Sequence, residues 1–310
     1  MSMQSNAVVE SSSNARDAGG AARPPTRPFF WSVRRELWEH RAIWIAPLAA
    51  AGFVLFGYAI SLSRMPHTLQ KIAKMPAMAQ QAIHMVPFAI APAAVGVTTL
   101  IVAVFYCLGT LYNERRDRSI LFWKSMPVSN LTTLLSKVCV PMIVLPITGF
   151  VIMCATQLVM LLMTAAAVAA YGMDASLWMQ VPVLHIWYLL IYGIVTGALW
   201  WAPIYGWLLV ISAWAKKGPF LWAVLPPLAI SVVEKLAFDT SYFSGLMNYR
   251  LGGWVHEAFS GFPQHHEKMF RWPETDPAKF FTSPGLWIGL AFAVGFFFLA
   301  VWLRRRREPM

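Results

Sequence analysis

VPFAIAPAAVGVTTLIVAVFYCLGTLY, residues 86–112, contains no charged residue, and it runs directly into NERRDRSILFWKSMPVSN, residues 113–130, which is charged and aromatic. About 20 apolar residues suffice for a helix to cross the roughly 30 Å of hydrocarbon in a bilayer. The first segment exceeds that length, so we expect a membrane-spanning helix. The second segment is too polar for the bilayer interior and marks where the chain enters water.

Six apolar stretches of this kind divide the chain, and none has an ionisable residue at its centre. With 58% hydrophobic and 13% charged residues, a soluble protein would have too little polar surface, so that class is excluded. The predicted spans are 43–62, 86–112, 138–170, 184–215, 219–238 and 284–303. The sequence therefore predicts an all-α integral membrane protein with six transmembrane helices in one domain, residues 28–310.

The third and fourth stretches are longer than a bilayer requires. Unbroken helices of this length would run to about 45–50 Å, so we expect them to tilt, protrude or bend. Proline removes a backbone N–H and disrupts a helix interior. Pro141, Pro146 and Pro203 are therefore the candidate bend sites.

Positive charge is unevenly distributed among the loops. Lys and Arg in short flanking loops are retained on the cytoplasmic side, and here they concentrate before the first span, after the second, after the fourth and after the last. We therefore expect both termini in the cytoplasm. This topology and attraction to anionic headgroups explain the formal net charge of +11, so no nucleic-acid partner is expected.

Residues 1–27 are rich in Ser, Ala, Asn and Gly and predict a disordered cytoplasmic tail. The following segment, 28–44, predicts an amphipathic interfacial helix with Trp31 and Trp38 at headgroup level. Its apolar arc, about 100° wide, holds Phe29, Phe30, Val33, Leu37 and Trp44, includes His40 as a polar flaw, and leaves out Arg34, Arg35 and Glu39. Two interpretations stay open: a membrane-surface helix, or a lever that joins the first span to a cytoplasmic partner.

The segment after the second span combines charge with large apolar side chains. Its first part, 114–118, would extend the helix into the cytoplasm, and the apolar run 120–123 follows at once. Residues 126–128 break the chain, and Ser129 is placed to cap the next helix, with Asn130 as the alternative. The exposed apolar run needs a partner protein or the headgroup region to bury it.

The stretch YNERRDRSILFWKSMPVS, 112–129, resembles the cytoplasmic signature of bacterial type-2 ATP-binding-cassette (ABC) exporter permeases. The resemblance extends from about Pro28 to the end of the chain and implies that loop 113–130 forms a coupling helix that docks on an ATPase subunit. The residues that would make this contact are Glu114, Arg115, Arg116, Arg118, Ile120, Leu121, Phe122, Trp123 and Lys124. The resemblance carries no information about the cargo.

The same resemblance implies several further properties. The chain would lie in the bacterial inner membrane and pair with a second permease copy, most simply an identical one. ATP and Mg²⁺ would be bound by the partner ATPase, with no cofactor in this chain. The long outer loop, 239–283, would contain short helices that dip into the membrane, and residues 242–259 are aromatic and amphipathic enough for this.

Missing motifs favour a transport subunit over an enzyme. The sequence contains neither a G-x-x-x-x-G-K-[ST] phosphate loop nor a G-x-S-x-G nucleophile motif, and its cytoplasmic segments are too short for an ATPase domain. We therefore expect no catalytic residue. An ion-driven carrier would place ionisable groups deep in its spans, whereas His185 and the Glu234–Lys235 pair are expected near span ends.

Metal binding is also not expected. His256–Glu257 and His265–His266–Glu267 lack a second His at H-E-x-x-H spacing, since Ser260 and Phe270 occupy the corresponding positions. Solvated loop histidines are the simpler interpretation. The three cysteines have no C-x-x-C spacing and lie in or beside spans, so they predict no disulfide framework.

A few polar and small residues within spans have two interpretations each. Glu234 and Lys235 are either a membrane-interface anchor or a polar gate at the outer mouth. Gln157 and the Trp200–Trp201 pair serve helix packing or contact cargo. The Gly193–Gly197 and Gly285–Gly289 pairs permit close helix approach and are candidate dimer seams.

The sequence thus favours a permease subunit of an ATP-driven exporter, coupled to separate ATPase subunits. The alternative from another class is a membrane scaffold or assembly protein in which residues 119–125 merely bind the bilayer. A secondary transporter is the third hypothesis, and the lack of buried charge in the spans counts against it.

Overall fold

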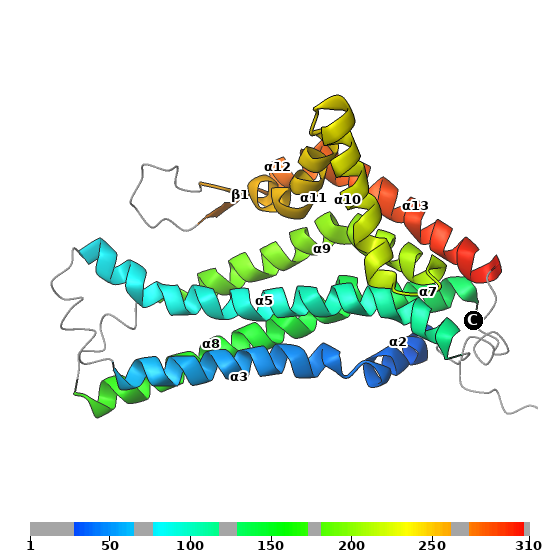
Figure 1. Ribbon diagram of the computed structural model, residues 1–310. Helices are drawn as coiled ribbons and strands as arrows, with labels where there is room; N and C mark the ends of the chain where they lie inside the picture. Colours follow the sequence, from blue (N-terminus) through cyan, green and yellow to red (C-terminus); the bar gives the residue numbers. More distant parts are fainter. Residues whose placement is uncertain (1–27, 65–76, 118–128, 173–180, 262–272, 307–310) are drawn as a thin grey trace, which may run out of the picture.

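The computed structural model describes residues 28–64, 77–117, 129–172, 181–261 and 273–306. Figure 1 shows an almost wholly helical chain. Its elements are α2 (Pro28–Glu39), α3 (Ala42–Ser63), α5 (Ala77–Arg116), α7 (Asn130–Cys139), a π turn η1 (Val140–Val144), α8 (Leu145–Ala170), α9 (Val183–Trp214), α10 (Pro219–Phe238), α11 (Tyr242–Ala258), β1 (Phe259–Ser260), β2 (Glu274–Thr275), α12 (Pro277–Thr282) and α13 (Pro284–Arg306).

Six helices are long and apolar enough to cross a membrane, which confirms the predicted all-α membrane fold. They are Ala42–Ser63, Met85–Arg116, Asn130–Ala170, Val183–Trp214, Pro219–Phe238 and Pro284–Arg306. The bounds of the six predicted spans agree at most ends. The third helix begins at Asn130, eight residues earlier than expected. The apolar pattern ends at the charged Lys137, but this residue is buried inside the helix, which continues through it.

The helices α3, α5, α8 and α9 run side by side, and α13 packs along α9 (Figure 1). The ends at Arg116, Asn130, Trp214 and Arg306 meet near the start of α3, and we name this region the charged end. The largest cluster of buried apolar side chains lies here and combines α5, α7, α9 and α13. By contrast, α10 is almost entirely exposed along its length.

The long third helix contains its expected irregularity. Pro141 cannot donate a hydrogen bond to the carbonyl of Lys137, and the backbone responds with the π turn η1. Pro146 follows at the second residue of α8, directly after the π turn. The fourth helix, α9, stays helical through Pro203. Ser129 caps α7 as predicted, because its hydroxyl accepts the N–H of Thr132 at 3.0 Å.

A second proline, Pro92, explains why the polar side chain of Gln157 is buried. Pro92 deprives the carbonyl of Phe88 of its helical partner, and Gln157 Nε2 donates to that carbonyl at 3.0 Å. Gln157 Oε1 in turn accepts from Trp187 Nε1 at 2.8 Å. The side-chain amide of Gln157 therefore joins three helices, α5, α8 and α9. Of the two interpretations of Gln157, helix packing and cargo contact, these bonds support helix packing.

Replacement of Gln157 by Leu should destabilise the fold. The carbonyl of Phe88 and the indole N–H of Trp187 would lose their partners, at a cost of roughly 1–3 kcal/mol in total. Thermal unfolding of the purified protein in detergent measures this loss. Leu162→Ala, at an exposed position of the same helix, is the matched control and should change the unfolding temperature much less. Equal effects of the two substitutions would contradict the bridging role.

Within segment 239–283, the described residues form the helices α11 and α12 and the antiparallel pair β1–β2. The helix α11 lies against three of the four glycines that were candidate dimer seams, and the fourth, Gly197, meets Trp201 of its own helix. Side chains of Tyr249 and Arg250 lie against Gly285 and Gly289, and Trp254 lies against Gly193. At Gly193, Gly285 and Gly289 the small residues admit side chains of α11 from the same chain. A dimer seam at either pair stays a prediction.

Candidate functional site

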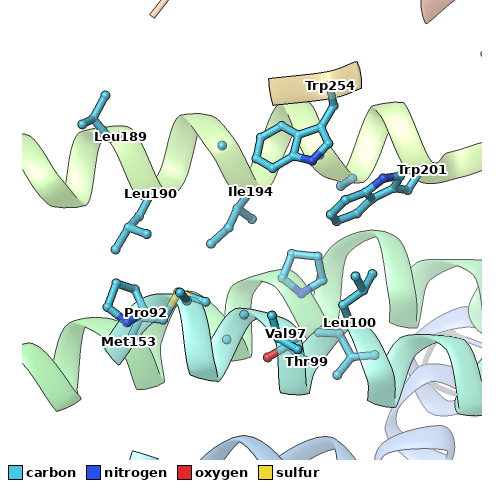
Figure 2. Close-up of a pocket in the computed structure, with 18 of the residues that line it drawn as sticks. Pro92, Val97, Thr99, Leu100, Met153, Leu189, Leu190, Ile194, Trp201 and Trp254 are labelled. Carbon is cyan, nitrogen blue, oxygen red and sulfur yellow. The ribbon is translucent and has the colours of Figure 1, made fainter. Parts of the chain in front are cut away.

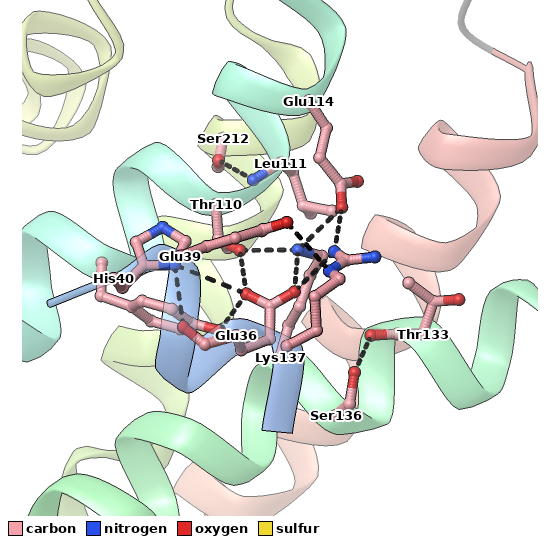
Figure 3. Close-up of polar contacts among 12 residues, drawn as sticks. Glu36, Glu39, His40, Thr110, Leu111, Glu114, Thr133, Ser136, Lys137 and Ser212 are labelled. Atoms are coloured by element: carbon pink, nitrogen blue, oxygen red, sulfur yellow. Dashed lines mark hydrogen bonds and ion pairs between the residues drawn. The ribbon is translucent and has the colours of Figure 1, made fainter. Parts of the chain in front are cut away.

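A cluster of buried charged side chains lies at the charged end, where α2, α5, α7 and α13 meet (Figure 3). Its two carboxylates are Glu36 and Glu114, with exposed fractions of 0% and 7%. Its three cations are Arg35, Lys137 and Arg304. We call these five residues the ion cluster.

The pair Glu36–Lys137 is the centre of the cluster. Lys137 Nζ lies 2.8 Å from Glu36 Oε1 and also donates to Thr110 Oγ1 at 2.8 Å. The other carboxylate oxygen of Glu36 accepts from the hydroxyl of Tyr106 at 2.9 Å. Arg35 Nη2 donates to Glu36 Oε1 at 2.9 Å. Both oxygens of this buried carboxylate are therefore satisfied.

Glu114 extends the cluster toward α13. Its carboxylate lies 3.0 Å from Lys137 Nζ, 3.0 Å from Arg35 Nη2 and 3.4 Å from Arg304 Nη2. Arg304 is buried, and its Nε and Nη1 have no hydrogen-bond partner within the described residues. The five side chains together carry one more positive than negative charge. Removal of one partner from such a buried group typically costs 3–5 kcal/mol.

Opposing effects set the pKa of Glu36. Burial alone would raise it, but the neighbouring ammonium of Lys137, its hydrogen bond, and the charge of Arg35 together lower the pKa from 4.5 to about 2. The carboxylate stays charged at neutral pH. A lowered folded-state pKa means that its stabilising effect is present above about pH 4.5 and is lost as the pH falls toward 2.

The stability of the protein should therefore fall as the pH decreases below about 4.5, and Glu36 should account for up to about 3 kcal/mol of the loss. In Glu36→Gln this contribution is absent, so the variant should be less stable at pH 7 and should lose less on acidification. Unfolding temperatures of both proteins in one detergent between pH 3 and pH 7 test this. Parallel curves would show that Glu36 does not contribute through its charge.

Two of the predicted coupling residues lie in the interior. Glu114 belongs to the ion cluster, and Arg115, with 3% exposure, donates through Nη2 to the carbonyls of Ser212 at 2.8 Å and Ala215 at 2.6 Å. These bonds satisfy carbonyls at the end of α9. The expected surface position of both residues is wrong because the buried face of α5 that includes Leu111 continues through them.

The other predicted coupling residues are placed differently. Arg116 is 62% exposed at its side chain and pairs with Asp117 at 3.2 Å. The remaining ones, Arg118, Ile120, Leu121, Phe122, Trp123 and Lys124, lie outside the described residues. At the end of α5, Glu114 and Arg115 are thus fixed to the helical core, while Arg116 faces outward.

The buried face of α2 agrees only in part with the apolar arc predicted for segment 28–44. Leu37 packs against the core, but Phe29, Phe30 and Trp44 are exposed, and Glu36 has the most buried side chain of the helix. His40 does face inward, with its ring 4.8 Å from that of Tyr106. On the outer face, the guanidinium of Arg34 lies over the rings of Trp31 and Trp38, an arrangement suited to the headgroup level predicted for them.

Glu36, Glu39 and His40 place potential metal ligands within 4.8 Å of one another. The oxygens of Glu36 are already occupied by Lys137, Arg35, Tyr106 and Thr110, and two of these partners are cations that disfavour a bound metal. In the loop, Glu257 accepts from Tyr249 at 3.1 Å, and the backbone carbonyl of His256 accepts from Lys279. His265, His266 and Glu267 lie outside the described residues.

Glu234 holds the start of α11. Its carboxylate accepts the backbone N–H groups of Tyr242 at 2.7 Å and Phe243 at 2.8 Å, and the hydroxyl of Thr240 at 3.1 Å. A carboxylate at a helix N-terminus satisfies orphan donors and favours the helix dipole. Lys235 instead forms an exposed pair with Asp239 at 2.7 Å. Of the two candidate gate residues, one therefore positions α11 and the other lies on the surface.

Loss of the Glu234 carboxylate should loosen α11. In Glu234→Ala the first turn loses its acceptor, which costs about 0.5–2 kcal/mol at a helix N-terminus. Hydrogen exchange of the amides in Tyr242–Ala258 should accelerate correspondingly, while exchange in α5 and α9 should not change. Lys235→Met, at the neighbouring exposed position, serves as the control and should leave these amides as they are. Unchanged exchange in Glu234→Ala would rule out the capping role.

Comparisons with protein-family models, curated proteins and solved structures find no match for this chain.

Proposed function

We propose that this chain is the membrane-spanning permease subunit of an ATP-driven exporter of the type-2 ABC class. The six apolar helices make it a multi-pass membrane protein that could form a transport path. The observation that carries the proposal further is the ion cluster, because it fixes both flanks of segment 118–128. On one side it holds Glu114 at the end of α5, and on the other Lys137 in α7.

The cluster gives a physical account of coupling. An ATPase subunit docked on residues 119–125 from the cytoplasm would push on a segment whose two ends are tied to each other by the contact of Lys137 with Glu114. The same ammonium binds Glu36, so α2 would move with them. A push would thus be transmitted to the second and third spans as a unit, and a path between two permease copies would open.

The ionic state of the cluster favours this role over that of a proton-driven carrier. A proton relay needs a group that exchanges protons near the working pH. The pKa of Glu36 is held at about 2 by Lys137 and its other partners despite burial, so this carboxylate does not exchange protons at neutral pH. Glu36 also lies at the charged end, where α2 meets α5 and α7, and so near the ends of the spans and not at their middle (Figure 1).

Association with an ATPase tests the proposal. In Phe122→Ala and Trp123→Ala, the proposed coupling helix loses a large aromatic anchor worth about 2 kcal/mol, so affinity for the ATPase subunit should fall roughly 30-fold. The complex is purified in mild detergent, the partner is identified by its phosphate-loop sequence, and ATP hydrolysis is measured. Phe298→Ala, a large aromatic exposed on α13, is the control and should bind normally.

The outcomes separate the hypotheses. If no ATPase subunit co-purifies, or if both aromatic variants bind and hydrolyse ATP as the wild type does, the export proposal fails. The scaffold hypothesis, in which residues 119–125 lie on the bilayer, predicts instead that Phe122→Ala and Trp123→Ala change only lipid contact and stability.

A further inference from the structure

An elongated cavity of about 480 Å³ lies between α5, α8 and α9 (Figure 2). Its lining extends from Phe88 to Ala103 along α5 and from Ile186 to Tyr205 along α9. At 1.5 Å per residue, the α5 wall is about 22 Å long. Trp254 of α11 (Figure 2) and Phe259 of β1 line it on the side of segment 239–283.

Small residues on facing helices create this space. The lining includes Ala89, Ala93, Gly96, Gly149, Gly193, Gly197 and Ala198. Protein interiors are close-packed, and an engineered apolar cavity of about 150 Å³ already takes up benzene. The space here is roughly three times larger, so we regard it as a binding cavity rather than a packing defect.

The chemistry of the lining disfavours a charged ligand. Among the described residues that line the cavity, none is charged. Thr99 Oγ1 donates to the carbonyl of Val95 at 2.8 Å, and Trp201 Nε1 donates to the carbonyl of Leu251 at 3.3 Å. The lining also contains the hydroxyl of Tyr205 and the indole of Trp254. With no charge and few polar groups, the walls recognise a ligand mainly by shape and dispersion.

The cavity opens toward the surroundings of the spans. Val97 belongs to its lining and also to the exposed apolar stripe of α5 that includes Ile90 and Ile101. In a membrane these side chains face hydrocarbon. A ligand can therefore enter sideways from the bilayer without crossing a polar barrier.

We propose that this cavity binds one acyl chain of a membrane phospholipid, with the headgroup outside. Two leaflets share about 30 Å of hydrocarbon, so one chain extends over about 15 Å, and the α5 wall accommodates that length. A rigid compact ligand would leave much of the narrow space unfilled. The identity of the cargo rests on the proposed export function: under it, the cargo is an amphiphile with such a chain.

Photolabelling tests the site directly. The wild-type protein is reconstituted in vesicles that contain phosphatidylcholine with a diazirine midway along its sn-2 chain, irradiated, digested and analysed by mass spectrometry. Label should concentrate on the α8 and α9 walls, for example at Met153 and Ile194, above the level on α10, which is almost entirely exposed. In Ala198→Phe the ring fills the cavity, and labelling of the walls should drop about tenfold.

Matched variants keep the test decisive. Ala165→Phe, on the exposed face of α8 outside the lining, should label as the wild type does. Ala93→Phe fills the cavity from α5 and replaces Ala198→Phe if that variant does not fold. Equal labelling of α10 and the cavity walls, unchanged by either filling variant, would mean annular lipid contact and would overturn the proposal. No ATPase is present in this experiment, so its result is independent of the export test.

Discussion

The ammonium of Lys137 and the carboxylate of Glu36 meet 2.8 Å apart inside the protein, and the ion cluster around this contact joins four helices, α2, α5, α7 and α13. Two charges removed from water are costly, and the attraction between them offsets this cost only when geometry and additional hydrogen bonds are favourable. Tyr106 and Thr110 supply those bonds from α5. The amphipathic helix α2 is consequently fixed to the core by a polar contact, not by its apolar face alone.

Backbone carbonyls impose the second constraint. Inside a bilayer no water satisfies a carbonyl that proline has deprived of its helical partner. The chain solves the problem in two ways. Gln157 of a neighbouring helix donates to the carbonyl of Phe88, one turn before Pro92. At Pro141 the backbone itself rearranges into a π turn. The hydrogen bonds of Gln157 join three helices, whereas the π turn changes the geometry of a single helix.

The sequence predicts the six spans well because length and hydropathy are local properties. It also predicts the Ser129 cap, which depends on a residue only three positions away. The ion cluster is different: Glu36 and Lys137 are separated by 101 positions, and their pairing depends on how α2 and α7 pack. A lone carboxylate next to Leu37 on an apolar face was the available signal. The cavity is harder still, since it depends on which small residues face one another.

The π turn η1 also sets an angular relation along the third span. In a regular helix, Lys137 and Gly149 would point about 120° apart, at 100° per residue. The one additional residue of a π turn reduces that difference to about 20°, so the same side of one helix presents its ammonium to the ion cluster and its glycine to the cavity. The phase of this helix thus couples the two sites: tightening of the turn at 140–144 into a regular α turn would rotate one site about the helix axis relative to the other.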